Sequence, residues 1–198
     1  MTDYFDPTYD DKSRWVSYWY QIREILNFNP RKVLVIGKGN GLVSDYLKLC
    51  GVEATTLDID ESLKPDVVSS VLNMPFSDNF FDVVLCAQVL EHLPYNDFPK
   101  ALSEIKRVIK LGAVISLPHF GPAIKFLLKI PLLPEIKFLL KIPYPKKHLF
   151  KKEHFWEIGE WGFPAGRIKR EFKKAGFSIA KDFVVFEKPL HHFFVLKK

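Results

Sequence analysis

The stretch Lys32-Val33-Leu34-Val35-Ile36-Gly37-Lys38-Gly39-Asn40-Gly41 decides the fold class of this chain. Residues 32–36 form a short apolar, β-branched run, which predicts a strand buried on both faces of a parallel sheet. Closely spaced glycines follow at once, and helical spacing of apolar residues returns at 42–49. A strand that ends in such a turn and continues into a helix predicts an α/β unit whose backbone can approach a ligand closely.

Apolar periodicity along the rest of the chain predicts further alternation of strands and helices. Strands are predicted at 53–57, 67–68, 80–86 and 113–117, helices at 12–27, 97–109 and 165–175, and a terminal hairpin of strands at 177–186 and 191–196. This alternation favours a doubly wound α/β sheet. The length of 198 residues suits one such domain, so we expect a single domain over 1–198 with an N-terminal helical segment at 1–30.

The alternation breaks between residues 119 and 151, where the sequence contains a local duplication. The segment PAIKFLLKIP at 122–131 recurs as PEIKFLLKIP at 134–143. Each copy opens with proline, which suits a first helical position, so the pattern predicts a helical insertion of two short helices. Because the insertion follows the fifth strand, it is expected to lie near the ligand-binding edge as a lid, or simply to cap the core.

Charge is distributed unevenly along the chain. Residues 1–118 carry 12 Lys+Arg against 16 Asp+Glu, whereas residues 119–198 carry 17 against 7. A basic surface of this kind can attract nucleic acid, anionic lipid or an acidic small molecule, and the simplest interpretation is a solvated lysine-rich face. Lysines beside apolar side chains in the insertion also suit peripheral contact with an anionic membrane.

Cysteine usage and the N-terminal composition predict a cytoplasmic protein. Cys50 and Cys86 stand far apart without metal-ligand spacing, so neither a disulfide framework nor a metal site is expected. The acidic residues 1–6 lack the basic-then-apolar order of a signal peptide. The longest apolar region, 123–145, is interrupted by lysines and prolines and is not expected to cross a membrane.

Asp58 is the second feature that points to a ligand at the glycine turn. It ends the strand predicted at 53–57, and from there a carboxylate can accept hydrogen bonds from both hydroxyls of a ribose. Capping of the segment that begins at Glu61 is the competing role, and Asp60 is the better candidate for it. The G-x-G-x-G spacing differs from the G-x-G-x-x-G dinucleotide fingerprint, because position 42 is leucine.

Three further stretches carry a resemblance to a known family: residues 72–82 (LNMPFSDNFFD), 89–93 (VLEHL) and 101–112 (ALSEIKRVIKLG). With the glycine turn, they resemble the class I S-adenosylmethionine-dependent methyltransferases, in particular the type 11 methyltransferase domain. The resemblance implies a Rossmann-like seven-stranded sheet in the order 3-2-1-4-5-7-6 with the last strand antiparallel. It also implies S-adenosylmethionine as the cofactor.

The same resemblance implies roles for individual residues. The glycines would flank the methionine part of the cofactor and Asp58 would hold the ribose, while Ile59 would pack on the adenine. Val71 and Leu72 would meet the adenine edge, and Ala87 and Gln88 would border the reacting methyl group. The predicted cofactor-binding residues are Gly37, Gly39, Gly41, Asp58, Ile59, Val71, Leu72, Ala87 and Gln88.

Two positions depart from the family pattern and motivate an alternative. Val35 stands where the family usually has an acid, and Ser70 stands where an acid often meets the adenine amino group. With the basic C-terminal half, these departures allow a non-catalytic module that binds a partner or an anionic surface. Binding of S-adenosylmethionine discriminates the two hypotheses.

Methyl transfer from a sulfonium mainly requires alignment of the acceptor with the methyl group and exclusion of water. If a base is required, His119 and His92 are the candidates, because neutral imidazole accepts a proton near pH 7. The segment after the fourth predicted strand lacks the motif of amino-group methylases, which favours oxygen or carbon acceptors. We expect a small-molecule or lipid-like acceptor; nucleic acid is not expected, and the oligomeric state is not predicted.

Overall fold

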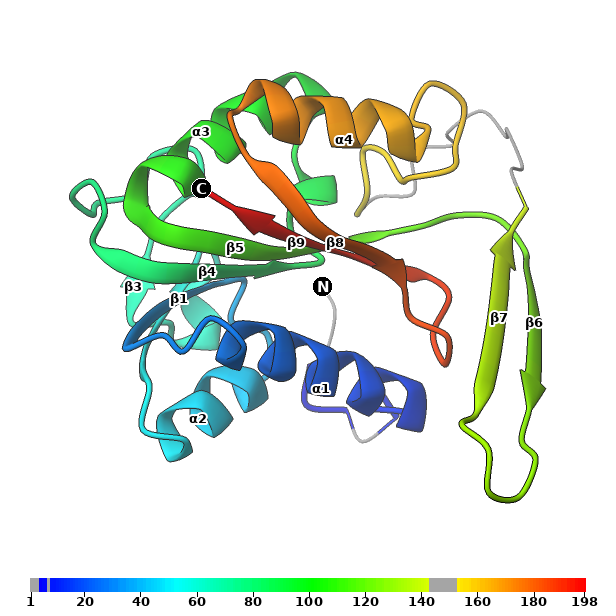
Figure 1. Cartoon of the computed structure of the whole chain (residues 1–198). Coiled ribbons are helices and arrows are strands. Elements are labelled where there is room, and N and C mark those ends of the chain that lie inside the picture. The colour runs from blue at the N-terminus through cyan, green and yellow to red at the C-terminus, as the bar shows by residue number, and fades with distance from the viewer. Residues whose placement is uncertain (1–3, 7, 143–152) are drawn as a thin grey trace.

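A mixed sheet of seven strands forms the centre of the protein (Figure 1). The computed structural model describes residues 4–6, 8–142 and 153–198. The strands of the sheet are β1 Lys32–Ile36, β2 Glu53–Asp58, β3 Val67–Val68, β4 Phe81–Ala87, β5 Ile109–Pro118, β8 Ser178–Val184 and β9 His191–Lys197. Their order is β3-β2-β1-β4-β5-β9-β8.

Strand directions agree with the order that the family resemblance implies. Neighbouring strands from β3 to β5 are parallel, whereas β9 runs antiparallel to both β5 and β8. Numbered in chain order, the seven strands therefore follow the predicted order 3-2-1-4-5-7-6, with the last strand antiparallel. This prediction of the fold is confirmed.

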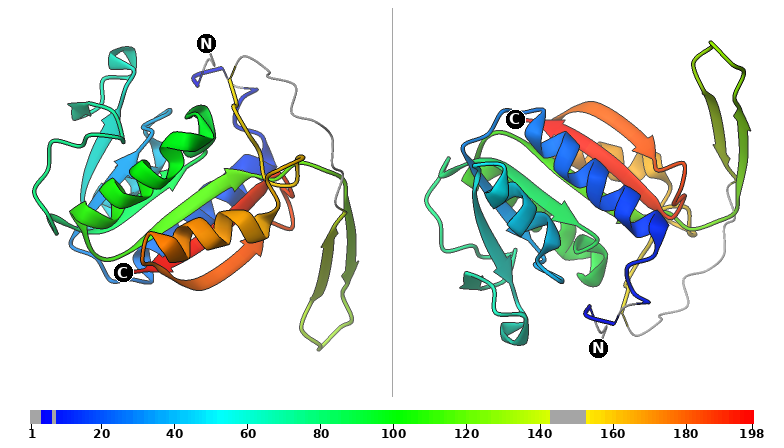
Figure 2. Two further views of the ribbon diagram at one scale, coloured as in Figure 1. Left: turned by 90° about the horizontal axis from the view of Figure 1, so that it is seen from above. Right: turned by 90° about the horizontal axis from the view of Figure 1, so that it is seen from below.

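Helices cover both faces of the sheet (Figure 2). The helices α1 Lys12–Leu26 and α2 Leu42–Leu49 pack on one face, and α3 Phe98–Val108 and α4 Ala165–Lys174 pack on the other. Three short 3-10 helices, η1 Glu61–Leu63, η2 Leu90–His92 and η3 Tyr95–Asp97, lie in the connections. Because β1 is buried on both faces, its continuous apolar run is explained by its central place in the sheet.

The duplicated segment is not helical, and the prediction of two short helices is wrong. Its copies form the strands β6 Ala123–Leu128 and β7 Ile136–Lys141, which pair as an antiparallel hairpin apart from the main sheet. Prolines bound each copy too closely for a helix that is stable by itself. The β-branched and aromatic residues instead favour strands, and the repetition places Phe126 opposite Phe138.

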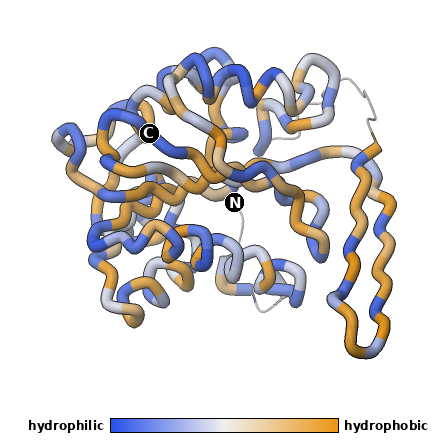
Figure 3. Tube along the Cα trace, viewed as in Figure 1, coloured by the Kyte–Doolittle hydropathy of each residue, from blue (hydrophilic) through white to orange (hydrophobic). Residues whose placement is uncertain are grey.

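The hairpin projects from the edge of the domain, and much of its trace is hydrophobic (Figure 3). Lys141 Nζ joins its base to the end of β5, donating to the backbone oxygens of His119 at 2.8 Å and Gly121 at 2.6 Å. The part of the predicted insertion from residue 143 to 151 lies outside the described residues. Among the described residues, no helix has the length and apolar composition that a membrane span requires.

Candidate functional site

The glycine turn lies at the carboxyl end of β1, as the sequence predicts. Gly37 has a φ of +81°, a left-handed conformation that side chains rarely adopt. A Cβ at this position would stand 2.4 Å from Cγ2 of Val89, which follows β4. Two strand ends therefore approach closely here, and only glycine allows it.

Asp58 faces the turn from the end of the neighbouring strand β2. One carboxylate oxygen accepts a hydrogen bond from the Lys38 backbone nitrogen at 2.8 Å, and the other accepts from the Asp60 backbone nitrogen at 3.0 Å. Each carboxylate oxygen can accept more than one hydrogen bond, so both retain capacity for a ligand. Asp60 caps η1 by accepting from the Ser62 backbone nitrogen at 2.9 Å, so the predicted capping role of Asp60 is confirmed.

A cavity of about 500 Å³ opens in front of the turn. Six of the predicted site residues line it: Gly37, Gly39, Asp58, Ala87, Gln88 and His92. The other five, Gly41, Ile59, Val71, Leu72 and His119, do not belong to its lining as the described residues form it. Their roles in binding or catalysis remain predictions.

Gln88 is held in an unusual backbone conformation at the wall of this cavity. Its φ is +55°, a value that residues other than glycine seldom adopt. Its backbone nitrogen donates to the Ser116 carbonyl at 2.9 Å, and its side-chain amide donates to the Ser116 hydroxyl at 3.2 Å. A strained backbone of this kind is typical of functional positions. Here the hydrogen bonds to Ser116 of β5 hold Gln88 in this conformation.

The N-terminal segment supplies a wall that the sequence did not reveal. The ring of Tyr4 packs over the turn, 3.7 Å from where a Cβ of Gly39 would stand, and Tyr9 lies edge-on to Tyr4. Arg14 lies over the Tyr9 ring, with its guanidinium carbon 3.8 Å from the ring centre. Tyr18 donates to Asp10, and because of burial and this carboxylate the pKa of its phenol is raised above the ordinary value. Aromatic side chains from the N-terminal segment and α1 therefore line the cavity.

A returning segment after the hairpin forms the remaining wall. The Trp156 side chain is fully buried, and its indole nitrogen donates to the Leu93 carbonyl at 3.1 Å. The Phe155 backbone nitrogen donates to the Glu91 carbonyl at 2.9 Å, and the Ile158 backbone nitrogen donates to the Pro118 carbonyl at 3.0 Å. These bonds bring His154 and Glu157 to the cavity, which they line.

The two histidines predicted as bases occupy different surroundings. His92 lines the cavity, and burial lowers the pKa of its imidazole. His119 lies beside His192, with their Nδ1 atoms 2.9 Å apart, and burial lowers the pKa of the His119 imidazole to about 3. Both rings are therefore neutral near pH 7, but only His92 is at the cavity wall.

Glu91, next to His92, has no exposed surface. Burial raises the pKa of its carboxyl to about 8. Glu91 was not among the predicted site residues, although it lies in the stretch 89–93 that carries the family resemblance.

The sheet order, the helix layers and the glycine turn define the class: this is the class I methyltransferase fold. Residues 34–117, from β1 to β5, match the family model described as a methyltransferase domain. This matched segment, which is less than half of the chain, resembles the S-adenosylmethionine-dependent methyltransferases.

Curated relatives resemble part of the chain. An uncharacterized protein of Methanocaldococcus jannaschii is 36% identical over 89 residues, which cover 41% of this chain and 38% of that protein. The ubiquinone/menaquinone biosynthesis C-methyltransferase of Cupriavidus metallidurans is 35% identical over 121 residues, which cover 52% of this chain and 49% of that enzyme. The matches thus span less than half the length of these relatives.

A solved structure supports the fold over nearly the whole chain. The 1,6-didemethyltoxoflavin-N1-methyltransferase of Burkholderia thailandensis, with its substrate and S-adenosylhomocysteine bound, superimposes with a TM-score of 0.67. The comparison covers 98% of this chain and 81% of that enzyme, at 15% sequence identity. At this identity the likeness concerns the fold alone.

Proposed function

We propose that the chain binds S-adenosylmethionine in the cavity and transfers its methyl group to a small-molecule or lipid-like acceptor, on oxygen or carbon. The single observation that carries this proposal is the hollow of about 500 Å³ bounded by the glycine turn and Asp58. Backbone without side chains suits close contact with the methionine part, and the carboxylate suits the ribose hydroxyls.

The chain's contribution to the reaction is mainly positional. S-adenosylmethionine, held by the glycine turn and Asp58, would supply an electrophilic methyl group to the acceptor. The aromatic cover of Tyr4 and Tyr9 excludes water, and Gln88 and Val89 line the wall at the end of β4. His92, neutral near pH 7, lines the cavity and would take a proton from an acceptor hydroxyl.

Replacing Asp58 with asparagine tests the cofactor site. The amide keeps one acceptor oxygen but loses the charge, so the affinity for S-adenosylmethionine is expected to fall about 10- to 100-fold, as for hydrogen bonds to charged groups. Asp60→Asn is the matched control, since Asp60 caps η1 and is not part of the cavity lining. Isothermal titration of both variants with S-adenosylmethionine provides the measurement.

Equal affinities in the two variants would contradict the role of Asp58. Absence of binding at millimolar S-adenosylmethionine in the unmodified protein would favour the alternative of a non-catalytic module. Mass spectrometry of the natively purified protein adds an independent observation, because a co-purified methyl donor or acceptor identifies the ligand directly.

The hairpin supports the lipid-like alternative among acceptors. Residues of β6 and β7 that alternate along the strands share one face, and on this face every side chain is apolar: Ile124, Phe126, Leu128, Ile136, Phe138 and Leu140. All six are exposed, and the tip residue Leu132 is fully exposed. Lys125 and Lys137 lie on the opposite face, where Lys137 pairs with Glu135 and Glu187, and Lys129 follows β6 near the tip. An apolar surface with adjacent cations suits insertion into an anionic membrane interface, from which a lipid-like acceptor would reach the cavity.

Leu132→Asp is expected to lower binding to anionic vesicles about tenfold or more, because it replaces a tip side chain whose burial stabilises by about 1.5–3 kcal/mol. Its exposure means that the fold is unaffected. Leu49→Asp is the matched control, since Leu49 is also exposed but lies at the end of α2. Co-sedimentation with phosphatidylglycerol-containing vesicles measures the effect. Equal sedimentation of the variant and the unmodified protein would contradict a role of the hairpin in membrane binding.

A further inference from the structure

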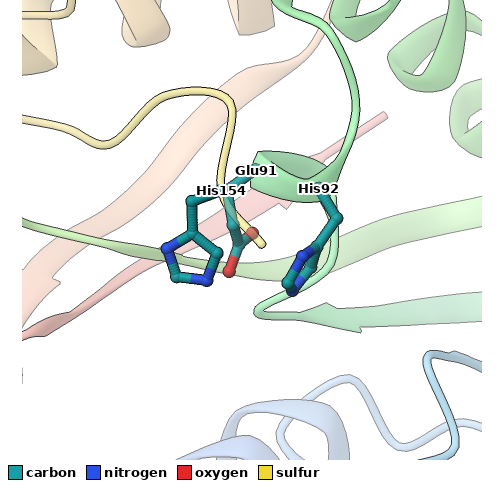
Figure 4. A group of neighbouring side chains, drawn as sticks. All are labelled: Glu91, His92 and His154. Carbon is teal, nitrogen blue, oxygen red and sulfur yellow. The ribbon is translucent and has the colours of Figure 1, made fainter. Parts of the chain in front are cut away.

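Three potential metal ligands meet at the wall of the cavity (Figure 4). Glu91 and His92 lie on η2, directly after β4, and His154 comes from the returning segment. One ligand atom from each residue lies within 4.8 Å of the other two. Figure 4 shows the carboxylate of Glu91 between the two imidazole rings. A single ion can be reached by all three side chains from these positions.

Glu91 provides an independent indication that a cation belongs here. The residue has 0% exposure, and among the described residues neither of its carboxylate oxygens has a hydrogen-bond partner. A buried carboxylate without a partner is costly, and native proteins keep such groups where they pair with a cation or hold a metal. The two histidines beside Glu91 can act as neutral metal ligands, but they do not give its carboxylate a permanent positive charge.

Each histidine is oriented by a contact at its Nδ1 atom. His92 Nδ1 lies 2.5 Å from the Glu153 carbonyl oxygen, and His154 Nδ1 lies 2.7 Å from a carboxylate oxygen of Glu157. Both oxygens are acceptors, so each ring donates from Nδ1 and, when neutral, carries its lone pair on Nε2. Outer contacts of this kind fix the tautomer of metal-binding histidines and raise their basicity.

We infer that Glu91, His92 and His154 bind one divalent first-row transition metal ion beside the cavity. Two imidazoles and one carboxylate suit zinc or iron, whereas magnesium and calcium prefer oxygen ligands alone. The spacing of the cysteines gave no reason to expect a metal site. The candidate ligands are instead two histidines and an acid, and His154 is distant in the sequence from Glu91 and His92.

With its Nε2 lone pair on the ion, His92 would no longer be available as a base, and the ion would instead give the cavity an acceptor-binding group. Three protein ligands leave at least one coordination position, and both His92 and His154 line the cavity. An acceptor with a hydroxyl or carbonyl oxygen would bind the ion through that oxygen and would be held beside the methyl donor. This role in acceptor binding rests on the proposed function, whereas metal binding itself does not.

Metal titration of the full chain, without S-adenosylmethionine, tests the site. The protein is treated with a chelator, dialysed and titrated with Zn²⁺ by calorimetry and with Co²⁺ by visible absorption. We expect one equivalent to bind, with an affinity for Mg²⁺ that is lower by a factor of at least about 100 because imidazole is a poor ligand for it. Glu91→Gln and His154→Gln are each expected to lower Zn²⁺ affinity about tenfold or more, as loss of even an outer contact does.

Glu61→Gln is the matched control, because it removes an exposed carboxylate on η1. Glu91→Gln is isosteric with the carboxyl group, so it is expected to fold; circular dichroism checks this. Cys50→Ser controls for zinc at the exposed thiol and is expected to retain the site. No binding of Zn²⁺ or Co²⁺, equal affinity in all variants, or loss of binding in Cys50→Ser would each overturn the inference. Because the metal titration uses no S-adenosylmethionine, a negative result would not affect the test of Asp58. A negative result for Asp58 would likewise not affect the metal site.

Discussion

Truncation of Trp156 to alanine is expected to lower the free energy of unfolding by about 3–5 kcal/mol, the usual cost of emptying a large buried aromatic site. Its side chain has 0% exposure and packs edge-on to Tyr95 and Phe98, with ring centres 5.2 and 5.0 Å away. The substitution also removes the hydrogen bond from the indole to the Leu93 carbonyl. Denaturant unfolding followed by circular dichroism measures the loss.

The same substitution is expected to weaken metal binding at the proposed site. Trp156 anchors the segment that carries His154, so its removal loosens the position of one ligand. Trp161→Ala is the matched control, because this tryptophan is 66% exposed and its loss is expected to cost less than about 1 kcal/mol. Similar stabilities for the two variants would show that the segment is not anchored through Trp156.

Substitution of Gly37 by alanine is expected to lower the affinity for S-adenosylmethionine at least about tenfold, equivalent to about 1.4 kcal/mol. Two effects combine at this position. The left-handed backbone strains any side chain by about 1–2 kcal/mol, and the new Cβ stands 2.4 Å from Val89. Because Val89 lines the cavity, its displacement changes the wall that faces the ligand.

Gly51→Ala separates the two effects. Gly51 has the same φ of +81°, but a Cβ there meets nothing within 4 Å, and the residue is not part of the cavity lining. The control is therefore expected to lose only the backbone contribution to stability and to bind the cofactor normally. Titration with S-adenosylmethionine, together with thermal unfolding, measures both quantities. If both variants bind equally, the close approach of the two strand ends is irrelevant to the ligand.

Local patterns were sufficient for most of the secondary structure. The predicted β1 at 32–36 and α2 at 42–49 have the observed bounds, because a continuous apolar run and a helical repeat each occur within one short segment. The duplicated segment was the exception. Proline at the start of each copy suggested helices, but pairing between the two copies decided for strands, and such pairing is a contact that neither copy reveals alone.

Some residues of the candidate site were likewise predicted from the sequence, and others were not. Sequence patterns selected the turn at Gly37 and the acid at Asp58, since both lie at strand ends whose meeting at one sheet edge follows from the α/β alternation. Tyr4, Tyr9 and Arg14 were missed because they reach the cavity from the N-terminal segment, by packing that carries no periodic signal.

The sequence by itself thus determined the order of the sheet, the resemblance to a methyltransferase domain and the position of the glycine turn, because each is carried by short local patterns. Only the tertiary structure decided that His154 joins Glu91 and His92. That meeting depends on the path of the segment at 153–158, which returns to η2 and the end of β5 through backbone hydrogen bonds with Glu91 and Pro118. Backbone hydrogen bonds are available to nearly every residue type, so these two bonds leave no local pattern in the sequence.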